Sequence, residues 1–419
     1  MTRIGTAAPA ALALGLAAMG TAAAAQDCST KIGAVLPTSV DWGQPIAATA
    51  QWVVDQVNEA GGAAGCAIEM VLRDTQVDPR VGVDAARALV DLDGVQVLLG
   101  AVASGVSMPI LTSVTVPSGV MQMSCCSSAT SFTRLAEEGG TNGLWFRTFA
   151  TTGVQAAVGV KVAQDQGWDS VTILYKNDDW GQDIGRIIAG YFEAAGIDVK
   201  GQVAINDAQP SYRAEVVQAL ATQPDAVYLA LYPLEGSAVA REWIGLGGTQ
   251  NMIVANSLKS DDFRAAVGMQ FLGSTFGTDT ASPRADSATS FVEAYRARFG
   301  SDPSGPGLAN SYDATFIALL AMEAAGPGAR GADIAAAVPR VTDPAGTPIS
   351  ADVAGFAAAK EVLAGGGTVM YQGATGNVRF DANGDVSAPA VIWGFAEDGI
   401  AELEYLSLDE VDAFLAALN

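Results

Sequence analysis

The 419-residue sequence contains no histidine. This absence excludes a Ser-His-Asp triad, a Cys-His catalytic pair and the zinc sites that use histidine. Most acid–base mechanisms thereby lose their commonest base. We expect a protein that is not an enzyme and that needs no metal ion or other cofactor.

Basic residues are also few. Lys and Arg number 22 against 45 Asp and Glu, so the formal net charge is −23 at pH 7. A charge of this sign opposes binding to nucleic acid phosphates and to anionic membrane surfaces. We expect an acidic, solvated surface and no nucleic acid or membrane-surface partner.

Long apolar runs are missing except at the amino terminus, although 50% of the residues are hydrophobic. There Arg3 gives a basic start, residues 8–18 form an apolar body, and three alanines precede Gln26 in the small-residue pattern that a signal peptidase cuts. The apolar body is shorter than the roughly 20 residues of a membrane-spanning helix. No lipid-anchor cysteine stands at the cleavage point. Residues 1–25 are therefore predicted to be a cleaved signal peptide, and the mature protein to be soluble and periplasmic.

Cysteines number four, and export permits them to form disulfides. Cys28 precedes a predicted strand over residues 31–36, and Cys66 precedes another over residues 67–72. If these strands are parallel neighbours, their starts lie together, so we predict a Cys28–Cys66 disulfide. Cys125 and Cys126 are adjacent in sequence, and the sequence leaves open whether they close a strained vicinal ring. No further Cys or His completes a metal site with them.

Alternating strands and helices dominate the chain after residue 30. Apolar runs typical of buried strands alternate with segments of helical periodicity up to residue 148, and the rhythm starts again in a second unit from residue 154. Such alternation favours parallel sheets with helices on both faces. The chain length is too great for one ordinary core and predicts two domains. The expected fold class is therefore α/β.

A dense group of hydrogen-bonding side chains lies in residues 123–131, with the sequence MSCCSSATS. It falls where a predicted strand ends and a predicted helix begins. Open α/β sheets bind ligands at the carboxyl ends of their strands. We therefore interpret this segment as one wall of a ligand cleft.

The order of these elements resembles the type I periplasmic solute-binding proteins of the branched-chain amino acid and amide class, typified by leucine/isoleucine/valine-binding proteins. The resemblance covers nearly the whole mature chain. It rests on short motifs in a common order: residues 36–38, 42–44, 100–105, 127–131, 146–148, 175–182, 224–227, 312–314 and 371–385.

The resemblance implies two doubly wound parallel-sheet lobes joined by three crossovers, with the ligand between the lobes. We expect crossovers near residues 148–151, 275–278 and 378–380. Lobe 1 would then comprise residues 26–148 and 278–378. Lobe 2 would comprise residues 149–277 and 379–419.

The resemblance also implies a carboxylate subsite at Ser104, Ser128 and Thr130. Helix amino termini stabilise anions, which suits this role, whereas ordinary helix capping is the structural alternative for the same hydroxyls. Trp180 and Tyr232 match second-lobe positions that cover the ligand, and core packing is the alternative for both. Trp42 would form a third aromatic wall.

Asn256 departs from the pattern implied by the resemblance. Amino acid binders of this class usually have an acidic residue at the matching position, which pairs with the ligand's ammonium group. A buried ammonium without a carboxylate partner is costly. Asp178, Asp179 or Glu235 could substitute for it. Otherwise the solute is an amide, an aromatic or hydroxy acid, or another small carboxylate.

The function that the resemblance implies is solute capture for an ATP-driven (ABC) importer, with lobe closure recognised by membrane permease subunits. The protein would act as a monomer. A sensory binding protein of the same fold is the first alternative, because sensing and transport both use lobe closure. An exported hydrolase with Cys125 or Cys126 as nucleophile is the second, although no base completes its site.

Overall fold

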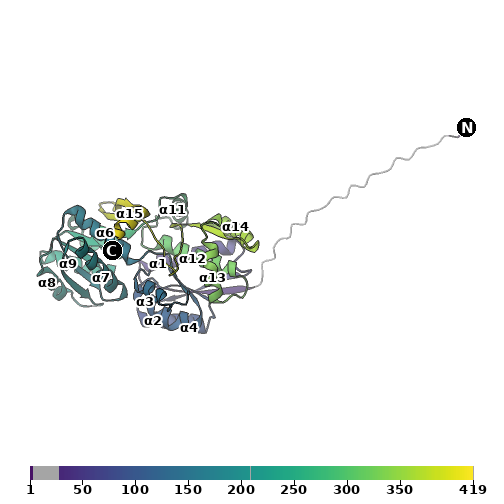
Figure 1. The fold of residues 1–419 in the computed structure, drawn as a ribbon, viewed down its shortest axis with the longest axis horizontal. Coiled ribbons are helices and arrows are strands. Elements are labelled where there is room, and N and C mark those ends of the chain that lie inside the picture. Colours follow the sequence, from purple (N-terminus) through teal and green to yellow (C-terminus); the bar gives the residue numbers. More distant parts are fainter. Residues whose placement is uncertain (3–27, 208, 419) are drawn as a thin grey trace.

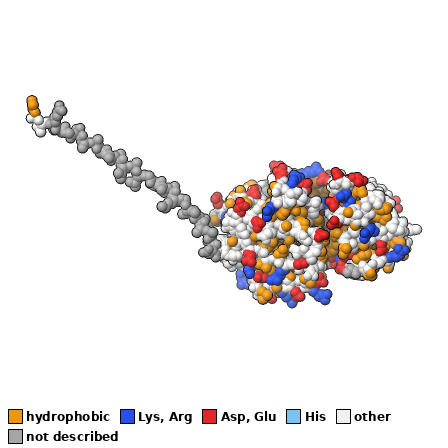
Figure 2. Space-filling model, turned by 180° about the vertical axis from the view of Figure 1, so that it is seen from behind, with side chains coloured by type: hydrophobic (Ala, Val, Ile, Leu, Met, Phe, Trp, Pro, Cys, Tyr) orange, Lys and Arg blue, Asp and Glu red, His pale blue; other side chains and the backbone are white. Residues whose placement is uncertain are grey.

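The computed structural model describes residues 1–2, 28–207 and 209–418, and Figure 1 shows its two lobes side by side. Nearly all of the predicted signal peptide lies outside these residues. Within the described part of the chain, no helix is both long enough and apolar enough to cross a membrane. On the face drawn in Figure 2, acidic side chains are scattered over both lobes among basic ones.

The first lobe is built on a parallel sheet in the order β2-β1-β3-β4-β5. β3 and β4 are buried along their whole length, because helices cover both faces of this sheet. One face packs against α1 and α12, and the other against α2 and α3. The strands are β1 (Ser29–Leu36), β2 (Ala67–Asp74), β3 (Val97–Gly100), β4 (Met121–Ser124) and β5 (Trp145–Arg147).

Helices of the first lobe come from two distant parts of the sequence. Those from the first part are α1 (Gly43–Glu59), α2 (Pro79–Asp91), α3 (Ser104–Ile110), a π-helical turn (Leu111–Thr115), α4 (Val116–Ser118) and α5 (Ser131–Glu137). Those from the second part are α11 (Asp286–Phe299), α12 (Leu308–Ala325), α13 (Gly331–Val341) and α14 (Val353–Ala364). A small sheet accompanies them, made of β11 (Thr347–Ser350), β12 (Val369–Gly373) and β13 (Gly376–Asn377).

The second lobe is built on a mixed sheet in the order β15-β14-β10-β9-β8-β6-β7. Its strands from β6 to β10 are parallel, and β14 and β15 add an antiparallel edge. The strands are β6 (Ser170–Lys176), β7 (Asp198–Ile205), β8 (Ala226–Ala230), β9 (Met252–Val254), β10 (Thr275–Thr280), β14 (Ala390–Ala396) and β15 (Gly399–Leu406). The helices are α6 (Thr152–Gln166), α7 (Asp179–Ala194), α8 (Arg213–Leu220), α9 (Pro233–Gly245), α10 (Asp261–Val267) and α15 (Leu408–Leu418), with short 3₁₀ turns at Asn256–Leu258 and Met269–Phe271.

Three segments join the two lobes between residues 28 and 418. They follow β5 at residues 148–151, follow β10 at residues 281–285, and lead from β13 to β14 at residues 378–389. The α/β fold class is thereby confirmed. The predicted boundary between the lobes at residues 277 and 278 falls inside β10, because the pairing of β10 with β14 continues to Thr280. The exact lobe ranges stay a prediction.

The predicted Cys28–Cys66 disulfide is confirmed. β1 and β2 are parallel neighbours, and their register pairs Ser29 with Ala67. The two cysteines therefore come together just before the strands begin, with their Cα atoms 5.1 Å apart. This distance lies in the ordinary range for a disulfide.

A buried ion pair joins the end of β5 to the third crossing segment. Arg147 Nε donates to Asp385 Oδ1 at 2.6 Å, and the two side chains are 0% and 8% exposed. The Arg147 backbone N–H also donates to the carbonyl of Gly384. Gly384 has φ +79°, and a Cβ there would overlap the carbonyl oxygen of Trp145, so this close approach requires glycine.

We expect Asp385→Ala to lower the free energy of unfolding by about 3–5 kcal/mol, because it leaves the Arg147 charge buried without its carboxylate. Urea denaturation measures this loss. Asp302→Ala is the control, since it breaks the exposed pair of Arg296 and Asp302, and exposed pairs contribute little. An equal effect of the two substitutions would contradict this account of the buried pair.

Candidate ligand-binding cavity

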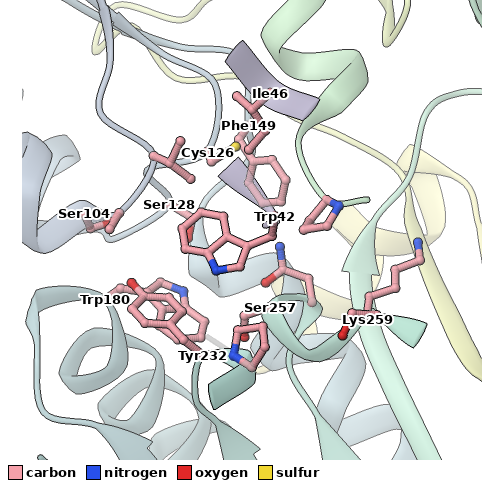
Figure 3. A pocket seen from close by; sticks show the side chains of 16 residues that line it. Trp42, Ile46, Ser104, Cys126, Ser128, Phe149, Trp180, Tyr232, Ser257 and Lys259 are labelled. Atoms are coloured by element: carbon pink, nitrogen blue, oxygen red, sulfur yellow. The ribbon is translucent and has the colours of Figure 1, made fainter. Parts of the chain in front are cut away.

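A cavity lies between the two lobes, where the carboxyl ends of strands from both large sheets face each other (Figure 3). The loops after β1, β3 and β4 form its first-lobe wall, and the segments after β6, β8 and β9 form its second-lobe wall. The residues that line it are Trp42, Ile46, Val102, Ala103, Ser104, Cys126, Ser128, Phe149, Trp180, Tyr232, Pro233, Asn256, Ser257, Lys259, Ser260 and Pro306. The structure thus brings together six of the seven predicted ligand residues, all except Thr130.

Aromatic rings from both lobes form one side of the cavity. Trp180 and Tyr232 stack with their ring centroids 5.2 Å apart and their planes 10° from parallel. Trp42 reaches across from the first lobe to within 6.2 Å of the Tyr232 centroid. These rings pack against one another and also face the cavity, so the packing interpretation and the ligand interpretation of Trp180 and Tyr232 are compatible.

Asp178 fixes the position of this aromatic wall. Its side chain caps α7 by accepting from the Gly181 N–H at 2.8 Å, and it accepts the Tyr232 hydroxyl at 3.1 Å. Burial raises the pKa of Asp178, and burial next to this carboxylate raises the pKa of Tyr232 well above its ordinary value. Tyr232 therefore remains a neutral hydrogen-bond donor.

Hydroxyl groups lie on the opposite, first-lobe side. Ser104 begins α3, and its Oγ accepts from the Ala129 N–H at 3.3 Å, while its own hydroxyl proton is free to bond elsewhere. Ser128 is held by its carbonyl, which accepts from the Thr152 N–H at 2.8 Å. Ser127 instead bonds within the protein, to the hydroxyls of Ser107 and Ser124. The hydroxyl-rich segment is therefore divided between internal support and the cavity surface.

Thr130 is placed differently from the prediction. Its backbone N–H and its Oγ1 both donate to the carboxylate of Asp183 on α7, each at 2.7 Å. Thr152 Oγ1 adds a third hydrogen bond to the same carboxylate at 2.6 Å. Thr130 thus joins the first lobe to α7 of the second lobe at a site outside the cavity lining.

Asn256 lines the cavity beside a carboxylate that sequence reasoning missed. Asp279 on β10 is 5% exposed, bonds to the Asn256 side chain, and pairs with Lys259 at 3.2 Å. Burial raises the pKa of Asp279, although Lys259 opposes the shift. Asp279 lies 23 residues after Asn256 in the sequence, on a strand that is not predicted from the sequence, so no local signal links the two.

None of the three carboxylates predicted as substitutes lines the cavity. Asp178 bonds to Tyr232, and Asp179 accepts the Ser131 hydroxyl at 2.9 Å. Glu235 is buried and pairs with Lys176 at 3.1 Å. Among the described residues of the lining, Lys259 is the charged one, and Asp279 neutralises it in part.

Cys126 also lines the cavity, and its Sγ lies 3.1 Å from that of Cys125. No disulfide joins the two thiols in this structure. The hydrogen bond with Cys125, together with burial, raises the pKa of the Cys126 thiol well above its ordinary value. Within the described residues, no cluster of His, Cys, Asp and Glu side chains could hold a metal ion.

Two α/β lobes with a cavity lined from both of them define a two-lobed binding protein. Residues 29–374 match the family of periplasmic binding proteins, and the chain belongs to that family. Its resemblance to the type I members of the branched-chain amino acid class is thereby confirmed.

Named relatives and solved structures agree with this assignment. The chain is 28% identical over 358 residues to the chemotactic signal transduction system substrate-binding protein BasB of Halobacterium salinarum, covering 84% of this chain and 82% of the relative. It is 27% identical over 303 residues to the Leu/Ile/Val-binding protein BraC3 of Rhizobium johnstonii, covering 70% and 79%.

Two solved structures share the fold. The leucine-binding protein LivK of Thermotoga maritima superposes with a TM-score of 0.72 at 21% identity, over 91% of this chain and 99% of that one. A solute-binding protein of an ABC transporter from R. palustris, solved in complex with benzoate, gives 0.70 at 16% identity, over 91% and 97%.

The bond between Thr130 and Asp183 predicts an effect on lobe opening. Asp183→Ala removes both hydrogen bonds from Thr130, so we expect the solute-free protein to open further and its radius of gyration in small-angle scattering to increase. Asp165→Ala is the control, because Asp165 is exposed and pairs with Lys161 on the same helix, α6. Identical scattering curves for the two variants would contradict a role of Asp183 in holding the lobes.

Proposed function

We propose that this protein is the periplasmic solute-binding component of an ABC importer and captures a small carboxylate- or amide-bearing solute between its lobes. The observation that supports this most directly is that both lobes contribute side chains to one cavity, Trp42 and Ser104 from the first and Trp180 and Tyr232 from the second. A solute that contacts both walls stabilises the closed form over the open one. Permease subunits would then recognise the closed shape.

The chemistry of the lining narrows the solute class. Ser104 and Ser128 offer hydroxyl donors suited to a carboxylate or an amide oxygen, and the aromatic wall suits an apolar or aromatic body. A solute ammonium group would find no acidic side chain among the described lining residues. We therefore favour a small organic acid or amide over an ordinary amino acid. The R. palustris protein that was solved with benzoate has the same fold.

A sensory role is the second candidate, and the similarity to the chemotactic BasB protein favours it. In that case lobe closure would be read by a membrane receptor instead of a permease. In both roles the protein would be exported by cleavage of residues 1–25, act as a monomer, and catalyse no reaction. Identification of a membrane partner by crosslinking in the native host distinguishes the two roles.

A thermal-shift screen tests solute binding. The panel contains benzoate, 3,4-dihydroxybenzoate, leucine, isoleucine and acetamide. At a hundredfold excess over its dissociation constant, a bound solute adds about 2.7 kcal/mol to the free energy of unfolding, which raises the melting temperature. We expect benzoate or 3,4-dihydroxybenzoate, acids that carry no amino group, to raise the melting temperature more than leucine does. A larger shift with leucine would contradict the proposed solute class.

Substitutions in the cavity test its assignment. We expect Ser104→Ala and Trp180→Ala each to weaken binding of the best solute by about tenfold or more, equivalent to about 1.4 kcal/mol or more, as measured by calorimetry. Ser118→Ala and Trp168→Phe are matched controls outside the cavity, and they should leave the affinity unchanged. Unchanged affinity in both cavity variants would show that the solute binds elsewhere.

A further inference from the structure

The vicinal cysteines after β4 have a chemistry that solute binding alone leaves unexplained. Their Sγ atoms are 3.1 Å apart, close enough for a disulfide to form with a small movement. Cys125 is 4% exposed, whereas Cys126 is partly exposed and lies beside Phe149 in the cavity wall (Figure 3). One sulfur is therefore accessible from the cavity, and the other lies directly behind it.

We propose that Cys125 and Cys126 form a reversible oxidation site in the cavity wall, where a small disulfide entering the cavity converts them into a vicinal disulfide. In the first step the Cys126 thiolate attacks one sulfur of the small disulfide, forms a mixed disulfide and releases one thiolate. In the second step the Cys125 thiolate attacks the Cys126 sulfur and releases the other thiolate. The two cysteine protons end on the released thiols, so two thiols are oxidised and one disulfide is reduced.

The surrounding loop is held in a way that confines this change to the two cysteines. Arg147 Nη1 donates to the carbonyls of Ser127 and Ala129 at 3.1 and 2.8 Å, and the Ser127 N–H donates to Ser124 Oγ at 3.1 Å. The chain is therefore anchored immediately before and after the pair. Closing the ring shortens the sulfur separation to about 2.05 Å and removes the Cys126 thiol proton from the cavity surface.

The space around the Cys126 sulfur is limited where Gly307 packs against it. Gly307 packs against this sulfur so closely that an added Cβ would overlap it. Gly307 therefore restricts movement of the sulfur toward the loop before α12. A ring formed by adjacent residues is strained, and strained disulfides are the more easily reduced ones. The proposed site is thus reversible.

The groups facing Cys126 predict a slow exchange that accelerates at high pH. The Cys125 thiol on the same loop raises the pKa of Cys126, as does the carboxylate of Asp279 on β10, which is paired with Lys259. Because only the thiolate attacks a disulfide, the rate should still be rising at pH 9.0, the ordinary pKa of a cysteine thiol.

The experiment uses bis(2-hydroxyethyl) disulfide, a small uncharged reagent, on the mature protein. Residual thiols are alkylated after denaturation, and peptide mapping by mass spectrometry follows. We expect the wild-type peptide that contains both cysteines to lose two hydrogens, to gain no reagent adduct, and to recover both alkylatable thiols after mild reduction. A wild-type peptide that keeps both thiols, or that stops at a mixed disulfide, overturns the proposal.

Two single variants test the proposed order of attack. Cys125→Ser keeps the accessible thiol and should accumulate a stable adduct on Cys126. Cys126→Ser keeps only the buried thiol and should react much more slowly. Faster adduct formation in Cys126→Ser than in Cys125→Ser would overturn the role of the cavity as the route of entry.

Coupling to the cavity is measured separately. The reduced and the oxidised protein are titrated with benzoate and with leucine by calorimetry, and we expect oxidation to change the affinity for the solute that binds by about tenfold or more. Equal affinities in both states would contradict the coupling. If neither compound binds the reduced protein, the proposed solute class fails, while the mass measurement still decides the oxidation site.

Discussion

The buried charge of Arg147 is the constraint on which the arrangement of the cavity depends. An unpaired guanidinium in the interior is strongly unfavourable, so this side chain must be met by acceptors from several directions. Asp385 supplies the carboxylate, the carbonyls of Ser127 and Ala129 supply two more acceptors, and Thr133 supplies a hydroxyl. One charge centre thereby fixes the loop after β4 and the turn before β14. It lies at the end of β5, next to the first crossing between the lobes.

The two walls of the cavity differ in chemistry because different loops form them. First-lobe loops present hydroxyls and a thiol, and second-lobe segments present stacked rings held by Asp178. Outside the cavity, Thr130 and Asp183 join the lobes directly. The lobes are therefore joined by contacts of the protein itself, apart from any contact that a solute would add. The relative strength of the contacts within the protein and the contacts with the solute determines how far solute binding shifts the equilibrium toward the closed form.

The fold is much more similar to known structures than the sequence is. The LivK protein, for example, superposes with a TM-score of 0.72 although its sequence is only 21% identical. Parallel sheets covered by helices need only buried apolar positions, which many sequences satisfy. Solute choice instead depends on a few side chains at strand ends. Here Asn256, Asp279 and Lys259 form a group in which the carboxylate already has a cationic partner within the protein.

The sequence by itself determined the α/β class, the Cys28–Cys66 disulfide and the gathering of Trp42, Ser104, Ser128, Trp180, Tyr232 and Asn256 around one cavity. The fold class follows from strand and helix periodicity, and the disulfide from the expectation that the two strands are parallel neighbours. The cavity residues follow from the resemblance to the type I family, which agrees with the rule that open α/β sheets bind ligands at their strand ends. Only the tertiary structure decided that Thr130 bonds to Asp183, that β10 continues to Thr280, and that Asp279 lies beside Asn256. These depend on packing between segments far apart in the chain, which local patterns do not encode. The adjacent cysteines illustrate both contributions. The sequence places them next to each other, and the fold determines that Cys126 faces the cavity and that Cys125 is buried.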